Sequence, residues 1–129
     1  MERGAPSGIR TYRDLKVWQD SMQLVEEAYR LALQFPKDEA FGLTTQVKRA
    51  AVSIPANIAE GYGRGTTGSY VQFLRIARGS HRELETHLLL VSRLGIAAAP
   101  SIEPLLAKCD TVGRMLHGLM SSIQDVDRS

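Results

Sequence analysis

The feature that most constrains the fold of this chain is a spacing of apolar residues that recurs in four separate stretches. In each stretch the apolar residues lie alternately three and four positions apart, which places them along one face of an α-helix. No stretch shows the alternation of apolar and polar residues that a half-buried strand would require. The pattern predicts an all-α protein with helices at about residues 13–35, 39–62, 69–94 and 102–125.

The loops between these predicted helices are short, and a chain of 129 residues has the size of one domain. Consecutive helices joined by short loops pack antiparallel in a bundle. We therefore expect residues 11–126 to form an antiparallel up-down-up-down four-helix bundle. Residues 1–10 contain Gly, Pro, Ser and Arg without any period, so we expect them to form a flexible N-terminal arm.

The first and third predicted helices carry more apolar residues than one row facing a core needs. In the first helix, the spacing assigns the core row to Leu15, Trp18, Met22, Val25, Tyr29 and Ala32, and a second row to Val17, Leu24, Ala28, Leu31 and Phe35. The third helix ends in four consecutive apolar residues, 88–91. A monomer would leave some of these side chains in water, so we expect the protein to associate with itself.

Residues 47–65, VKRAAVSIPANIAEGYGRG, combine an interior proline with a glycine-rich end. Pro55 cannot donate a backbone hydrogen bond, and its ring crowds the carbonyl of Ala51. Packing against neighbouring helices is therefore expected to hold this helix together across the proline. The glycines that follow, from Gly61 to Gly65, are expected to end it.

Positive charge is concentrated in the middle of the chain. The formal net charge is only +2 at pH 7, but residues 48–93 contain seven lysines or arginines and three glutamates. No apolar run approaches the length of a membrane-spanning helix, and the opening MERGAPSGIR lacks the apolar core of a signal peptide. We expect a soluble, cytoplasmic protein without a membrane partner.

Three arginines of the third predicted helix share one face, because Arg75, Arg78 and Arg82 are spaced by three and four residues. The planar guanidinium group suits phosphate, so this row is a candidate surface for nucleic acid. Alternatively, it is a solvated face that is partly paired with Glu83 and Glu85. Basic residues of the second helix extend the candidate set, which is Arg75, Arg78, Arg82, Lys48, Arg49 and Arg64.

Polar residues also lie beside the predicted core, at Asn57, Glu60, Ser80 and Glu83. A buried polar group without a partner is costly, so such residues usually form hydrogen bonds between helices and fix their register. The alternative is a pair of carboxylates that performs acid–base chemistry. We favour the structural role.

The histidines and the single cysteine offer no catalytic or metal-binding motif. None of His81, His87 and His117 belongs to a Glu-x-x-His or His-Glu-x-x-His motif, so we expect no metal site and no cofactor. Cys109 lies in the apolar row of the fourth helix, where a small core residue is expected rather than a nucleophile. These patterns predict a protein that is not an enzyme.

Three segments resemble a known family: DLKVWQDS (14–21), FGLTTQVKRAAVSIPANIAEGYGR (41–64) and FLRIARGSHRELETHL (73–88). They are similar to the bacterial four-helix-bundle proteins encoded in intervening sequences of 23S rRNA genes. That family is in turn similar to the accessory variability protein of diversity-generating retroelements. The resemblance covers about residues 11–95, and its most specific part is SIPANIAEG inside the second helix.

The resemblance implies a bundle that assembles into a homopentameric ring. For the retroelement relatives it implies a basic surface that binds nucleic acid and a reverse transcriptase as partner, whereas the intervening-sequence proteins have no established activity. With the arginine row, it predicts a non-enzymatic module that contacts the phosphates of RNA or DNA without reading sequence. The alternative is a protein–protein adaptor whose ring presents its surface to an enzyme such as a reverse transcriptase.

Overall fold

The computed structural model describes residues 8–39 and 42–128, and over these residues it contains four α-helices and no strand. They are α1 (Lys16–Ala32), α2 (Leu43–Gly63), α3 (Thr67–Arg93) and α4 (Ala99–Arg128). Two short 3-10 helices, η1 (Tyr12–Asp14) and η2 (Lys37–Glu39), precede α1 and α2. The prediction of an all-α protein with four helices is confirmed.

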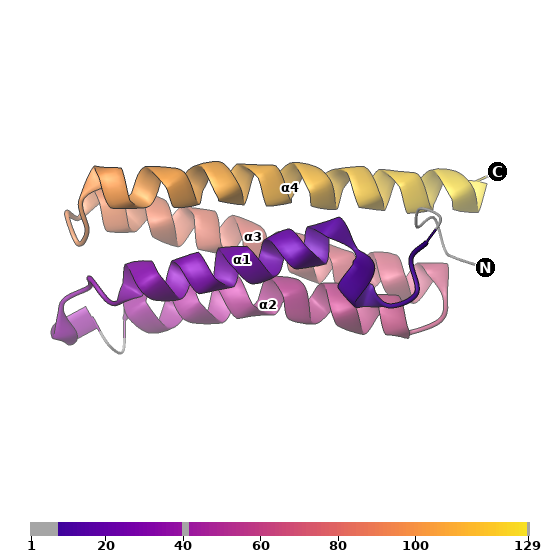
Figure 1. Ribbon diagram of the computed structural model, residues 1–129, viewed down its shortest axis with the longest axis horizontal. Helices are drawn as coiled ribbons and strands as arrows, with labels where there is room; N and C mark the ends of the chain where they lie inside the picture. Colours follow the sequence, from indigo (N-terminus) through magenta and orange to yellow (C-terminus); the bar gives the residue numbers. More distant parts are fainter. Residues whose placement is uncertain (1–7, 40–41, 129) are drawn as a thin grey trace.

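The four helices lie side by side along the long axis of the molecule, and each runs back alongside the one before it (Figure 1). Each helix contacts two neighbours, in the circular order α1, α2, α3, α4, and the contact between α2 and α3 is the most extensive. Most of the predicted N-terminal arm, residues 1–7, lies outside the described residues.

Several helix boundaries differ from the predicted ones, because caps and turns rather than apolar spacing determine them. The prediction began the third helix at Ser69, but α3 begins at Thr67, since the Thr66 hydroxyl accepts a hydrogen bond from the Ser69 backbone N–H at 3.2 Å. The predicted start at 39 falls in η2, and α2 begins at Leu43, with residues 40–41 outside the described part. The fourth helix begins at Ala99 instead of residue 102.

The first helix also begins and ends inside its predicted range of 13–35. Its predicted first turn is the separate 3-10 helix η1, and α1 starts at Lys16. Thr11 caps η1 by accepting a hydrogen bond from the Arg13 backbone N–H at 3.1 Å. The helix ends at Ala32, and after this end the chain turns so that Phe35 is buried against the core.

The core row of α1 was assigned correctly only at its two ends, where Leu15 and Ala32 are buried, whereas the row predicted to be secondary is the more completely buried one. Leu24 and Ala28 have no exposed surface, whereas Met22 is 40% and Tyr29 42% exposed. The correct row was hard to recognise because Ser21 interrupts it. That side chain is fully buried, and its hydroxyl donates a hydrogen bond to the Val17 carbonyl at 2.6 Å.

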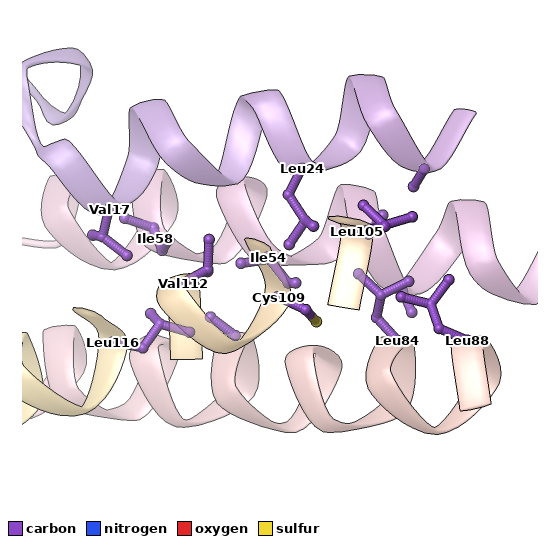
Figure 2. Packing of buried hydrophobic residues seen from close by; sticks show 14 of the residues in the cluster. Val17, Leu24, Ile54, Ile58, Leu84, Leu88, Leu105, Cys109, Val112 and Leu116 are labelled. Carbon is purple, nitrogen blue, oxygen red and sulfur yellow. The ribbon is translucent and has the colours of Figure 1, made fainter. Parts of the chain in front are cut away.

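The core rows predicted for the other helices agree closely with the structure. In α3 the apolar row with spacings of three and four residues is buried along its whole length, and its members are Tyr70, Leu74, Ala77, His81, Leu84, Leu88 and Val91. Figure 2 shows side chains from all four helices meeting, with Leu24, Ile54, Leu84 and Cys109 among them. In α4 the spacing of three and four residues leads from Leu116 to Leu119, but Leu119 is only partly buried and the neighbouring Met120 is buried instead.

The α2–α3 hairpin depends on a close approach at Gly61, near the end of α2. A Cβ atom at Gly61 would lie 2.8 Å from the Cβ atom of Phe73 and 3.2 Å from the Tyr70 carbonyl oxygen on α3. Only glycine allows the two helices to come this near. The turn that follows places Gly65 at a φ of +90°, a conformation that favours glycine.

Candidate nucleic-acid interface

The three arginines of α3 lie on the side of that helix which borders α4. Arg75 and Arg82 are exposed and Arg78 is half-buried. Arg78 and Arg82 line a groove of about 360 Å³ between α3 and α4. Arg75 lies on the same face of α3 but does not line the groove. Within the described part of the chain, none of the three forms an ion pair. The pairing with Glu83 or Glu85 that formed part of the alternative, a solvated face, is therefore not seen among the described residues, while the exposure of Arg75 and Arg82 agrees with such a face.

The opposite wall of the groove comes from α4. It is formed by Asp110, Gly113, Arg114 and His117, while Glu85 of α3 completes the rim. Arg114 pairs with Asp110 one turn earlier, with Nη2 and Oδ2 3.4 Å apart. Both side chains are largely exposed, so this pair contributes little to stability. The guanidinium group of Arg114 thus faces the same groove as the α3 arginines.

His81 lies at the base of the groove and is only 8% exposed. Its Nε2 atom is 2.6 Å from the backbone carbonyl oxygen of Cys109 on α4. A carbonyl can only accept, so Nε2 carries the hydrogen and donates it. The ring also lies against Gly113, where a Cβ atom would be 2.7 Å from Nε2. His81 therefore connects α3 to α4.

Cys109 is a fully buried core residue, as its position in the apolar row predicted. Burial, with smaller contributions from the nearby Glu85 and Asp110 carboxylates, raises the pKa of its thiol to about 12. A thiol nucleophile or metal ligand acts as the thiolate, which this environment disfavours.

The basic residues of α2 do not join the α3 row. The Lys48 ammonium lies over the Tyr29 ring, 4.9 Å from its centroid, on the side where α1 and α2 meet. Near the end of α2, the Arg64 guanidinium lies 4.9 Å from the centroid of the Phe73 ring, and its Nε is 3.1 Å from Glu60. These side chains are engaged locally, away from the α3–α4 groove.

The groove between α2 and α3 is separate and contains a polar network. Arg49 and Glu83 line this second groove. Beneath them the Ser53 and Ser80 hydroxyls are 2.7 Å apart, and Asn57 Nδ2 donates to Ser53 Oγ at 2.9 Å. The expected hydrogen bonding between helices therefore involves Asn57 and Ser80 and passes through Ser53, which was not among the predicted residues.

The model of the 23S rRNA-intervening sequence protein family matches residues 13–118. The chain belongs to this family. A solved structure with a similar fold is that of a protein of unknown function from the S23 ribosomal protein family of Bacteroides thetaiotaomicron. Its TM-score is 0.76 at 21% identity, with 81% of this chain and 95% of that chain covered. No curated protein matches the chain.

The intervening-sequence family match includes both walls of the α3–α4 groove, since the residues lining it lie between Arg78 and His117. Over the described residues of this family member, no group of three or more His, Cys, Asp or Glu side chains is arranged to hold a metal ion. Nor does any helix in that part of the chain have the length and apolar character to cross a membrane.

Sequence reasoning missed the contribution of α4 to the groove. Arg114 and His117 were not considered as binding residues, because the fourth helix was interpreted only through its apolar row. Their spacing of three residues places them on one face, and that spacing was the available indication. Which helix this face would meet is a property of the fold, and the sequence pattern does not contain it.

Proposed function

We propose that this member of the intervening-sequence family is a non-enzymatic module that associates with nucleic acid in the cytoplasm. The observation that carries the proposal is the row of Arg75, Arg78 and Arg82, none of which has a carboxylate partner among the described residues. Arginines that share a face repel one another, and a phosphate backbone would relieve that repulsion.

The proposed contact is independent of sequence. No Phe, Tyr or Trp side chain lines the α3–α4 groove, so the groove lacks the large aromatic rings on which successive bases stack, and its only aromatic rings are the imidazoles of His81 and His117. Lys48 and Arg64 are engaged on other faces and Arg49 is exposed beside the α2–α3 groove, so we assign all three weaker contacts at the periphery. Assembly into a homopentameric ring, as implied by the resemblance to the accessory variability protein, would repeat the arginine row around an axis.

The experiment is a titration of fluorescently labelled single-stranded RNA and DNA with purified protein at about 50 and 200 mM salt, followed by anisotropy. Affinity should fall steeply with salt, because each neutralised phosphate releases condensed counterions. Replacing Arg75, Arg78 and Arg82 with glutamine should weaken binding to all sequences and flatten the salt dependence.

A matched control removes the same charge elsewhere, by replacing the exposed residues Arg13, Arg30 and Lys37 with glutamine. If the effect were only one of net charge, both triple variants would lose the same affinity. Absence of binding to either RNA or DNA by the wild-type protein at about 50 mM salt, where screening is weak, would rule out the proposal.

The second candidate function is that of an adaptor, and the outer face of α1 favours it. Trp18, Met22, Val25 and Tyr29 form an apolar row on this helix, and Met22 and Tyr29 are 40% and 42% exposed. We call these four residues the outer row. The adaptor role would be supported if this protein co-eluted with a reverse transcriptase in size-exclusion chromatography and bound no nucleic acid.

A further inference from the structure

The α3–α4 groove contains hydrogen-bond acceptors as well as donors. Arg78, Arg82 and Arg114 supply guanidinium donors. The carboxylates of Glu85 and Asp110 lie in the same lining and accept hydrogen bonds. A surface that bound only phosphate would be weakened by these carboxylates, because they repel the same charge that the arginines attract. The groove therefore suits a ligand that combines a phosphate with a group that donates hydrogen bonds.

His81 provides a third acceptor at the base of the groove. Its Nε2–H is used by the Cys109 carbonyl, and in the neutral ring this makes Nδ1 an acceptor. Nδ1 has no hydrogen-bond partner among the described residues, although the side chain is 8% exposed and forms part of the groove lining. Nδ1 is not one of the buried side-chain atoms that lack a partner, so it is open to the groove, and a ligand that supplies a donor at that point can bond to it.

We propose that this groove binds the ribose-phosphate backbone of RNA and distinguishes it from DNA. The arginines contact the phosphate, and His81 Nδ1 and the Glu85 carboxylate accept hydrogen bonds from ribose hydroxyls. The 2′-hydroxyl is a donor that DNA lacks, and it is the group through which proteins tell the two nucleic acids apart. The inference rests on the proposed function and adds the class of nucleic acid.

The experiment compares three single strands of equal length: oligouridine, oligodeoxyuridine and 2′-O-methyl oligouridine. The methylated strand keeps the oxygen and the charge but cannot donate a hydrogen bond. Loss of one or two hydrogen bonds predicts that RNA binds about three- to thirtyfold more tightly than either of the other two strands. The readout is the ratio of dissociation constants at one salt concentration.

Two variants assign the preference to the groove. Glu85→Gln removes a charge and should raise affinity for DNA while lowering the ratio between RNA and DNA. Glu83→Gln is the matched control, because Glu83 lies on the other side of α3, in the α2–α3 groove. It removes the same charge and should leave the ratio unchanged.

His81→Gln tests the acceptor directly. A glutamine amide can still donate to the Cys109 carbonyl but places no acceptor at the position of Nδ1, so the ratio should fall. Circular dichroism establishes whether this variant is folded, and Glu85→Gln decides the question if it is not. A preference for RNA that survived in the folded His81→Gln variant and in Glu85→Gln would overturn the assignment to this groove.

Failure of the inference is distinct from failure of the proposed function. Equal affinity of the wild-type protein for all three strands overturns the inference and leaves sequence-independent phosphate binding intact. No binding to any strand removes both. A free nucleotide, uridine monophosphate, serves as a competitor. If it displaced oligouridine at the same molar concentration as unlabelled oligouridine, the groove would be a nucleotide site and the assignment to an RNA chain would be wrong.

Discussion

The imidazole ring of His81 on α3 lies directly against the backbone of Gly113 on α4. A Cβ atom at position 113 would be 2.6 Å from Cε1 and 2.7 Å from Nε2, closer than packed atoms approach. The ring cannot easily move aside, because Nε2 is hydrogen-bonded to the Cys109 carbonyl. The spacing of the two groove walls therefore depends on the absence of a side chain at Gly113.

Gly113→Ala is expected to destabilise the protein by about 1–3 kcal/mol, the usual cost of overpacking. Gly118→Ala is the matched control, because it lies on the same helix and a Cβ atom there would meet nothing within 4 Å. Alanine at that position should be stabilising by about 0.5–1 kcal/mol through helix propensity. Urea denaturation measures both changes, and equal free energies of unfolding for the two variants would contradict the close packing at His81.

Gly61→Ala tests the close approach of α2 and α3. The added Cβ would lie 2.8 Å from the Cβ of Phe73, an atom fixed to the α3 backbone, so the helices themselves must separate. We expect a loss of about 1–3 kcal/mol in the free energy of unfolding. Gly63→Ala is the matched control, because Gly63 lies two residues further along the same helix and a Cβ atom there would meet nothing within 4 Å. This substitution should have a much smaller effect. Thermal unfolding of both variants checks the difference.

Burial of the Cys109 thiol predicts that the folded protein loses stability at alkaline pH. Its pKa rises from an ordinary value of 9.0 to about 12 in the folded protein, so the thiol ionises first in the unfolded chain. The stabilisation is therefore present below pH 9 and is lost as the pH rises toward 12. Above pH 9 the wild-type protein should lose up to about 1.4 kcal/mol more per pH unit than Cys109→Ala. Parallel pH profiles of the two proteins would show that the thiol does not ionise differently on unfolding.

Self-association through the outer row of α1 is expected to give a particle near five times 14.2 kDa, the pentamer implied by the resemblance. Met22→Lys should reduce that mass, because it would bury an unpaired charge in an apolar interface. Glu26→Lys places a lysine at an exposed position of the same helix outside the outer row, and should leave the mass unchanged. Sedimentation velocity at micromolar concentration measures all three proteins. A wild-type monomer would end the ring hypothesis.

The helical periodicity predicted which face is buried wherever a single apolar row runs the whole length of a helix, as it does in α3, where the surplus apolar residues Leu89 and Leu90 are exposed. In α3 the row through Leu74, Leu84 and Leu88 is fully buried, as expected. In α1 two apolar rows compete, and the spacing alone favoured the outer one. The buried row includes Ser21, whose hydroxyl bonds to its own helix, so polarity concealed the correct face.

The arginines of α3 could be recognised from sequence, but their site could not. Arg78 and Arg114 are far apart in the chain and meet only because α4 packs against α3. The assignment of Lys48 to the same surface was reasonable on charge, yet its position on α2 directs it to the Tyr29 ring instead. Helix periodicity relates residues within one helix and contains no information on which faces of two helices become neighbours.

The unequal packing of the helices has a consequence for the groove. The α2–α3 hairpin has the most extensive interhelical contact, while α4 rests against it and against α1 with less. Regions with fewer contacts open at lower free energy, so amide protons of α4 should exchange with solvent sooner than those of α3. A ligand held between the two helices would slow exchange along α4 in particular. The last helix of the chain thus reports occupancy of the groove, whatever molecule occupies it.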